Sequence, residues 1–205
     1  MNKSSIQEAF LLEKVAGIVR ARSFEEAKEK SILLKSGGLK IIELAYEEQF
    51  FTKFIEWSKD YLSEIRIGAA SLITLQQAKE AIDSGANFLV SPIANTQMID
   101  LALQNNLDII PGAFSPTEIA DIIHNFPELS CIKLFPSDSA TYFRNTLKVF
   151  PNIDFLISSF KISEIESFIN YGAKMFVVGS YFTDDHNLTV NRIKRILDLV
   201  HLNRD

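Results

Sequence analysis

Two charged residues interrupt apolar stretches of the sequence and could do chemistry there. Lys133 lies in CIKLFP (131–136), and Glu43 lies in KIIELA (40–45). Burial disfavours the charged form of an amine, and a neutral lysine amine can attack a carbonyl carbon to form a Schiff base. A carboxylate beside it could move protons during such a reaction. The alternatives are structural: Lys133 could reach water from a strand end, and Glu43 could form an ion pair with Lys133 or Arg20.

These two stretches belong to a series of eight short apolar runs, which predicts eight buried strands. The runs cover residues 15–20, 40–45, 66–71, 87–92, 108–113, 131–136, 154–159 and 175–180. Stretches with helical periodicity separate the runs, for example residues 23–36, 74–85, 115–126 and 161–172. Ser23 and Ser115 each have a glutamate three residues on, which is typical of a helix start. Strands that alternate with helices indicate a parallel sheet, and eight such units predict an α/β protein, a single (β/α)8 TIM barrel.

No linker or low-complexity segment divides the sequence, so one barrel domain is expected over residues 1–205. A short helical segment, at about residues 1–14, would precede the first strand. A weak internal repeat supports this division, since SGGLKIIEL, SGANFLVSP and YGAKMFVVG each place a glycine shortly before a strand. A doubly wound open sheet is the alternative, although no Gly-x-Gly-x-x-Gly motif follows the first run.

The C-terminal ends of barrel strands carry the chemistry of such folds, so polar residues there are the candidates. They are Arg20, Glu43, Ser71, Ser91, Lys133, Ser158, Ser159 and Ser180. Glu43 and Lys133 are the charged residues that lie within the strand runs themselves. A carboxylate and an amine directed to the same barrel end would form a proton-transfer group and a nucleophile.

These stretches resemble the 2-keto-3-deoxy-6-phosphogluconate and 4-hydroxy-2-oxoglutarate aldolase family from about Val15 to Leu199. IKLFPSD resembles the motif with the family's Schiff-base lysine, Lys133 here, and IIELAYEE resembles the segment with its proton-transferring glutamate, Glu43. IVRARSFEEA, IGAASLITLQQAKEAIDSGANFLVSP and DIIPGAFSPTE are similar to the first, the third and fourth, and the fifth units. The resemblance implies a homotrimer of (β/α)8 barrels and a class I aldolase that needs no metal or other cofactor.

The implied reaction cleaves or forms a small-molecule 2-keto acid, such as 2-keto-3-deoxy-6-phosphogluconate or 4-hydroxy-2-oxoglutarate, to or from pyruvate and an aldehyde. Lys133 would form the iminium, and Glu43 would carry protons. The matched motifs imply these substrate-binding residues: Arg20, Ser71, Pro92, Phe135, Ser159, Lys161, Gly179 and Ser180. Two alternatives stay open. One is a catalytically altered barrel with a binding or regulatory role, and the other is a 2-oxo acid decarboxylase that uses the same lysine.

Two departures from the family pattern concern substrate charge. Glu47 stands where the family usually has an arginine that holds the substrate carboxylate, so the local charge is reversed. Arg20 is the nearest candidate by position to replace that arginine. Alternatively, Glu47 lies in the first turn of a helix opened by EEQFF, where acidic residues are favoured.

The second departure concerns the segment after the seventh strand, where the family has Thr-Gly-Gly facing the substrate phosphate. Ser159, Phe160 and Lys161 stand there in this sequence. Phe160 lacks the conformational freedom of glycine, and its side chain fills space, whereas Lys161 could supply a positive charge. Gly179 and Ser180 match the Gly-Ser that the family has after the eighth strand, which is the other half of the phosphate-binding region. We therefore expect the reaction chemistry to be kept and substrate recognition to differ.

Composition excludes several other classes of function. The chain has 205 residues, 47% of them hydrophobic, a net charge of −5 and no basic run, so nucleic acid is not an expected partner. No apolar stretch reaches the length of a membrane span, and the first residues lack the apolar core of a signal peptide. A single cysteine cannot form an internal disulfide, which fits the reducing cytoplasm. That cysteine, Cys131, lies in an apolar run, so we expect it to be a small packed residue. His124, His186 and His201 lie far apart without further ligands at metal spacing, so no metal site is expected.

Overall fold

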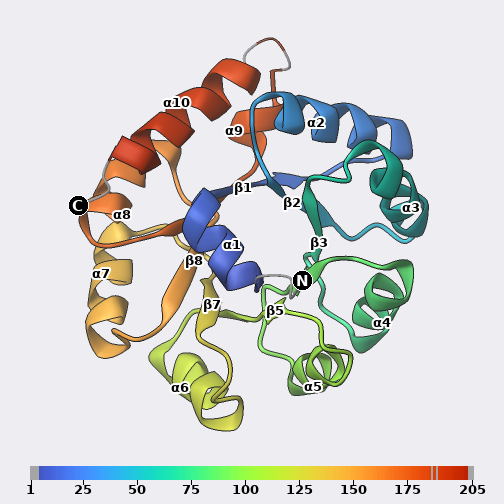
Figure 1. Ribbon diagram of the computed structural model, residues 1–205. Helices are drawn as coiled ribbons and strands as arrows, with labels where there is room; N and C mark the ends of the chain where they lie inside the picture. Colours follow the sequence, from blue (N-terminus) through green and yellow to red (C-terminus); the bar gives the residue numbers. More distant parts are fainter. Residues whose placement is uncertain (1–4, 186, 188, 203–205) are drawn as a thin grey trace.

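The computed structural model describes residues 5–185, 187 and 189–202, and its strands form one parallel sheet curved into a barrel (Figure 1). The strands follow the order β5-β4-β3-β2-β1-β9-β8-β7-β6, and all neighbouring pairs are parallel. They are β1 (Val15–Val19), β2 (Ile41–Ala45), β3 (Arg66–Ala70), β4 (Phe88–Val90), β5 (Ile109–Ile110), β6 (Gly112–Ala113), β7 (Cys131–Leu134), β8 (Asp154–Ser158) and β9 (Met175–Val178).

The nine strands occupy eight barrel positions, because Pro111 alone separates β5 from β6. Proline has no backbone N–H to donate to a neighbouring strand, so it divides one barrel strand into two short pieces. Its carbonyl oxygen still accepts a hydrogen bond of 2.9 Å from the backbone N–H of Lys133 on β7. The predicted (β/α)8 TIM barrel is therefore confirmed, and each predicted run contains a strand. The extent of one domain over the whole chain stays a prediction.

Helices cover the outer face of the barrel (Figure 1). They are α1 (Ile6–Glu13), α2 (Phe24–Ser36), α3 (Phe51–Tyr61), α4 (Leu75–Ser84), α5 (Thr96–Gln104), α6 (Pro116–Asn125), α7 (Ala140–Val149), the 3-10 helix η1 (Ile162–Glu164), α8 (Ile165–Asn170), α9 (Ser180–Thr183) and α10 (Thr189–Leu202), with α1 the exception inside the ring. The four predicted helical stretches contain α2, α4, α6, and η1 with α8. Ser23 and Ser115 accept hydrogen bonds from the backbone N–H groups of Glu26 and Glu118, as the caps predict. Within the described residues, no helix combines the length and apolar character required to cross a membrane.

The N-terminal end of the barrel is closed by α1, which lies across its centre (Figure 1). Phe10 is fully buried among inward-facing side chains of the strands, and its ring meets the Phe88 ring edge-on at a centroid distance of 6.2 Å. Two carboxylates at the starts of strands attach this helix. Asp108 accepts from the backbone N–H of Ile6 at 2.7 Å, and Asp154 accepts from the Gln7 side chain at 2.8 Å. Apolar packing and polar attachment therefore seal this end.

Candidate active site

Lys133 and Glu43 meet inside the barrel. Lys133 Nζ lies 3.3 Å from Glu43 Oε2, and the two residues are 5% and 0% exposed. Their strands place them there because alternate residues of a strand face the same side. Cys131 shares the inward face of β7 with Lys133, and Ile41 shares that of β2 with Glu43, and both belong to the apolar cluster inside the barrel. The predicted amine and carboxylate are thus neighbours although 90 positions separate them in the chain.

The pair lies in apolar surroundings, and one of its polar atoms has no partner. Glu43 Oε1 is buried and makes no hydrogen bond within the described residues. Gly68 pairs in register with Glu43 and leaves room for the Phe88 ring, because a Cβ at Gly68 would lie 2.3 Å from that ring. A buried acceptor without a partner is costly and rare in native proteins. This carboxylate therefore keeps a free oxygen beside an amine, an arrangement suited to proton transfer with a bound reactant.

A cavity of about 670 Å³, here called the mouth cavity, opens where β1, β7, β8 and β9 end. Its lining residues are Ile18, Arg20, Phe135, Asp138, Ser158, Ser159, Phe160, Lys161, Ile162, Val177, Val178, Gly179, Ser180, Tyr181 and Asp184. The Lys133–Glu43 pair adjoins this cavity. Phe135 follows Lys133 by two residues, and Ile18 pairs in register with Glu43. The Lys133–Glu43 pair thus lies next to a space that can hold a small molecule.

Six of the eight predicted substrate-binding residues line the mouth cavity: Arg20, Phe135, Ser159, Lys161, Gly179 and Ser180. Ser71 and Pro92 do not. Ser71 is half-buried after β3 with a φ of 62°, and the backbone of Pro92 lies close against Gly112. Three further polar residues line the cavity that the sequence patterns did not single out: Asp138, Tyr181 and Asp184. Asp138 follows the Phe-Pro-Ser segment after β7, so the rule of strand-end polar residues could have found it.

Glu47, the residue at the family's arginine position, is exposed and does not line the mouth cavity. The alternative that Glu47 lies in the first turn of a helix is wrong, because α3 begins at Phe51. Glu47 instead opens a turn, where its carbonyl oxygen accepts from the backbone N–H groups of Phe50 and Phe51. Glu47 therefore adds no negative charge to the lining of the mouth cavity.

Phe160 is partly buried and anchors the loop after β8. Its ring packs on Phe168 and Phe176 at centroid distances of 5.6 and 5.7 Å. The left-handed backbone conformation in this loop belongs to Ser159, with a φ of 63°, and not to Phe160. The loop thus uses an aromatic anchor in place of the glycine pair that the family pattern has there.

Ser137, which is 1% exposed, joins the loop after β7 to the end of β8. Its hydroxyl donates to the Leu134 carbonyl oxygen and accepts from the backbone N–H of Ser158 at 3.3 Å. Its own backbone N–H donates to the Ser158 carbonyl oxygen at 3.0 Å. Two loops that line the mouth cavity are therefore held at a fixed separation.

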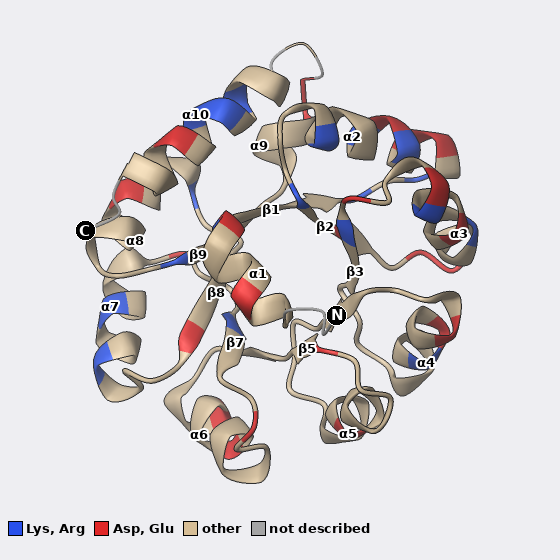
Figure 2. Cartoon of the chain, in the orientation of Figure 1, with Lys and Arg blue, Asp and Glu red and all other residues tan. Residues whose placement is uncertain are grey.

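The charges of the rest of the molecule lie mainly on the outer helices and loops (Figure 2). Burial raises the pKa of the Cys131 thiol inside the barrel, and the carboxylates of Asp154 and Asp108 add to this effect. Cys131 is buried in the apolar cluster inside the barrel, which confirms the small packed residue predicted from sequence. The described residues contain no group of three or more His, Cys, Asp or Glu side chains that could hold a metal ion. His186 lies outside the described residues.

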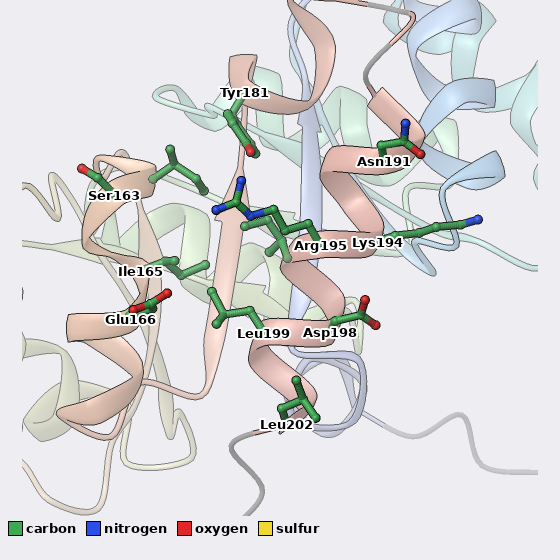
Figure 3. A pocket seen from close by; sticks show the side chains of 12 residues that line it. Ser163, Ile165, Glu166, Tyr181, Asn191, Lys194, Arg195, Asp198, Leu199 and Leu202 are labelled. Atoms are coloured by element: carbon green, nitrogen blue, oxygen red, sulfur yellow. The ribbon is translucent and has the colours of Figure 1, made fainter.

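A larger cavity, of about 840 Å³, lies outside the barrel between α8 and α10 (Figure 3). Arg195 and Leu199 of α10 face Ser163 and Ile165 across it. Neither cavity is lined by Lys133 or Glu43 themselves, but their neighbours Phe135 and Ile18 line the mouth cavity and not this one. The two cavities share only Ile162 and Tyr181. Volume alone therefore does not select the candidate site, and proximity to the buried Lys133–Glu43 pair favours the mouth cavity.

Comparison with known proteins gives consistent matches. A family model described as KDPG and KHG aldolase matches residues 6–199. The chain is 28% identical over 134 residues to a 2-dehydro-3-deoxy-phosphogluconate aldolase of Treponema pallidum, a match that covers 65% of this chain and 63% of that protein. The chain thus spans less than two thirds of the length of this curated relative.

Solved structures share the fold. A 2-keto-3-deoxy-6-phosphogluconate aldolase from Zymomonas mobilis superposes with a TM-score of 0.82 at 17% identity, over 96% of each chain. The KDPG aldolase of Legionella pneumophila, which holds pyruvate captured as a covalent carbinolamine intermediate, gives a TM-score of 0.76 at 19% identity. That superposition covers 98% of this chain and 99% of the other. At these identities the likeness supports the barrel fold.

Proposed function

Because this chain belongs to the KDPG and KHG aldolase family, whose model matches residues 6–199, we propose that it is a class I aldolase with Lys133 as its Schiff-base residue. The observation that carries the proposal is the buried pair of Lys133 Nζ and Glu43 Oε2, 3.3 Å apart beside the mouth cavity. The carbinolamine captured in the Legionella pneumophila relative supports the same type of chemistry.

The neutral amine of Lys133 attacks the C2 carbonyl carbon of a 2-keto acid, and one amine proton passes to the new hydroxyl group. Protonated Glu43 then donates a proton to that hydroxyl, which leaves as water and gives an iminium. As the C3–C4 bond breaks, its electron pair forms a C2=C3 double bond and the C=N π electrons move to the nitrogen, which gives an enamine. Glu43 accepts the C4 hydroxyl proton, so the other fragment leaves as an aldehyde. Glu43 returns this proton to C3, and water then releases pyruvate and regenerates the amine.

The mouth cavity supplies the remaining contacts for the substrate. The guanidinium of Arg20 suits the carboxylate of the 2-keto acid, because its fork of N–H donors matches the two oxygens. Ser159, Lys161 and Ser180 line the region left for the aldehyde portion. Phe135 and Gly179 shape the wall, and Ser71 and Pro92 belong to the predicted contacts that lie outside this cavity.

Trapping of the Schiff base tests the proposal. The protein is incubated with pyruvate and sodium borohydride, and its peptides are analysed by mass spectrometry. We expect a reduced pyruvyl adduct on Lys133, lost in the Lys133→Met variant and retained in Lys161→Met, which removes the lysine that lines the mouth cavity. An adduct confined to Lys161 would contradict the assignment. No adduct on a folded protein in excess pyruvate would favour the binding or regulatory barrel.

The homotrimer and the cytoplasmic location are part of the same proposal. Three large apolar side chains, Ile73, Ile93 and Phe114, remain exposed in the loops after β3, β4 and β6. Exposed apolar groups of this size are often covered by a second protein surface, which supports self-association. Light scattering coupled to gel filtration is expected to give three times the mass of the chain, and a monomer mass would contradict the trimer.

A further inference from the structure

The mouth cavity contains an unusual set of charges for a site that would bind a phosphorylated substrate. Arg20 and Lys161 provide two positive charges, and Asp138 and Asp184 provide two negative charges. Within the described residues, none of these four side chains forms an ion pair or a side-chain hydrogen bond. Their charges are therefore available to a bound molecule, and their formal sum is zero.

A phosphate group fits poorly into this arrangement. A phosphate dianion in the mouth cavity would meet the like charges of Asp138 and Asp184, and each repulsion opposes binding. The loop after β8 also presents the ring of Phe160, fixed on Phe168 and Phe176, where closely approaching backbone N–H groups would be needed to hold phosphate oxygens. An additional carboxylate on the aldehyde portion would meet the same two aspartates.

An uncharged, hydroxylated group fits the same residues well. Once Arg20 binds the carboxylate of the 2-keto acid, Lys161 and the two aspartates remain. Carboxylates accept hydrogen bonds from hydroxyl groups, and such charge-assisted bonds are short and strong. Ser159 and Ser180 add hydroxyl groups that both donate and accept. Building on the proposed function, we infer that the aldehyde portion of the substrate is uncharged and carries several hydroxyl groups.

Kinetic comparison of three substrates tests this inference. Pyruvate release is measured from 2-keto-3-deoxygluconate, from its 6-phosphate and from 4-hydroxy-2-oxoglutarate. We expect kcat/KM for the unphosphorylated sugar acid to exceed the other two values by about tenfold or more. The reason is that Asp138 and Asp184 would each repel the phosphate or the second carboxylate of the other two substrates. A higher kcat/KM for the phosphate or for the dicarboxylate would overturn the inference.

Charge-removing variants assign the preference to the two aspartates. Asp138→Asn and Asp184→Asn are each expected to raise relative kcat/KM for the phosphorylated acid by about fivefold, the effect of one charge interaction near water. Asp121→Asn, on the exposed face of α6 and away from the mouth cavity, is the matched control and should leave the ratio unchanged. An unchanged ratio in both cavity variants would overturn the role of these aspartates.

A binding measurement separates this inference from the Schiff-base assignment. Calorimetry compares 2-keto-3-deoxygluconate with its 6-phosphate on Lys133→Met, and on Lys133→Met/Glu43→Gln in case the first variant is unstable. We expect tighter binding of the unphosphorylated acid to either variant, even if the unaltered protein shows no turnover. Tighter binding of the phosphate, or no binding of either acid at millimolar concentration, overturns the inference. If turnover and borohydride trapping both fail while the unphosphorylated acid still binds more tightly, the proposed aldolase function is contradicted and the inference about the substrate is not.

Discussion

The two ends of the barrel use the same kinds of charged side chain in opposite ways. At the N-terminal end, Asp108 and Asp154 are hydrogen-bonded to α1, and Asp154 also forms an ion pair of 3.0 Å with Lys174. At the C-terminal end, Asp138 and Asp184 have no such partner among the described residues. Paired groups hold the fold together, whereas unpaired groups around a cavity remain available to a ligand.

The Lys133–Glu43 pair lies between these two ends and shares features of both. It is buried and paired, as at the sealed end, yet Glu43 Oε1 keeps an unused acceptor, as at the open end. A buried ion pair is a weak way to gain stability, because desolvation offsets much of the attraction. The pair is therefore better explained by a reaction at the open end than by a structural role.

Glu43→Gln should have the largest effect, because it removes the proton carrier and leaves the shape of the side chain intact. We expect kcat for pyruvate release to fall by about 10²–10⁴-fold, the usual contribution of a general acid or base. Steady-state kinetics measures this loss, and circular dichroism checks the fold. Glu47→Gln, the exposed glutamate outside the mouth cavity, is the control and should keep normal kcat. Similar kcat values for both variants would show that the Lys133–Glu43 pair has a structural role and no catalytic one.

Phe10→Ala tests the sealed end. It removes a fully buried ring that meets Phe88, so we expect the free energy of unfolding to fall by about 3–5 kcal/mol. Denaturant unfolding measures the change. Leu12→Ala, on the exposed side of the same helix, should change stability by less than about 0.5 kcal/mol. Phe10→Ala protein that is still folded should keep its KM, and a large rise in KM would show that the two ends are not independent.

The sequence predicted the barrel well because its signals are local. Each strand run shows its burial within a few residues, and caps such as Ser115 with Glu118 form within one helical turn. Lys133 and Glu43 were identified because a charge within an apolar run is itself a local anomaly. Asp138 was within reach of the strand-end rule, whereas Asp184 was missed because its approach to the same cavity depends on how separate loops fold. The start of α3 was misplaced because Glu47 hydrogen-bonds in a turn that precedes the helix.

Tyr46 provides a paired group at the open end and thus tests whether pairing, rather than position, marks a structural role. Its hydroxyl donates to Glu80, and burial together with this bond raises the pKa of Tyr46 to about 12 from its ordinary value of 10.0. A raised pKa means that the neutral form is favoured in the folded state. The stabilisation that the neutral Tyr46 hydroxyl gives to the folded state is therefore complete below pH 10 and is lost as the pH rises towards 12.

Tyr46→Phe should lower the free energy of unfolding by about 1 kcal/mol at pH 9, because it removes one hydrogen bond to a charged group near the surface. The difference from the unaltered protein should shrink between pH 10 and 12, since phenylalanine cannot ionise. Urea unfolding at pH 9, 10 and 11 measures this. A difference that stays constant over these pH values would contradict the role assigned to the hydroxyl group, and a loss of kcat would place Tyr46 with the functional groups.

Ser137→Ala should have an effect no larger than that of Tyr46→Phe and would sharpen the comparison at the boundary between structure and function. The Ser137 hydroxyl accepts from the Ser158 N–H at 3.3 Å, so its removal leaves a buried donor without that partner. We expect a loss of about 1 kcal/mol in the free energy of unfolding, measured in urea. Ser36→Ala removes an exposed hydroxyl bonded within its own helix, so it should cost less than about 0.5 kcal/mol. The backbone bond from Ser137 N to Ser158 O survives the change, so kcat should stay within about twofold. A larger fall in kcat at unchanged stability would mean that this hydroxyl positions the reactive lysine strand and does not merely join two loops.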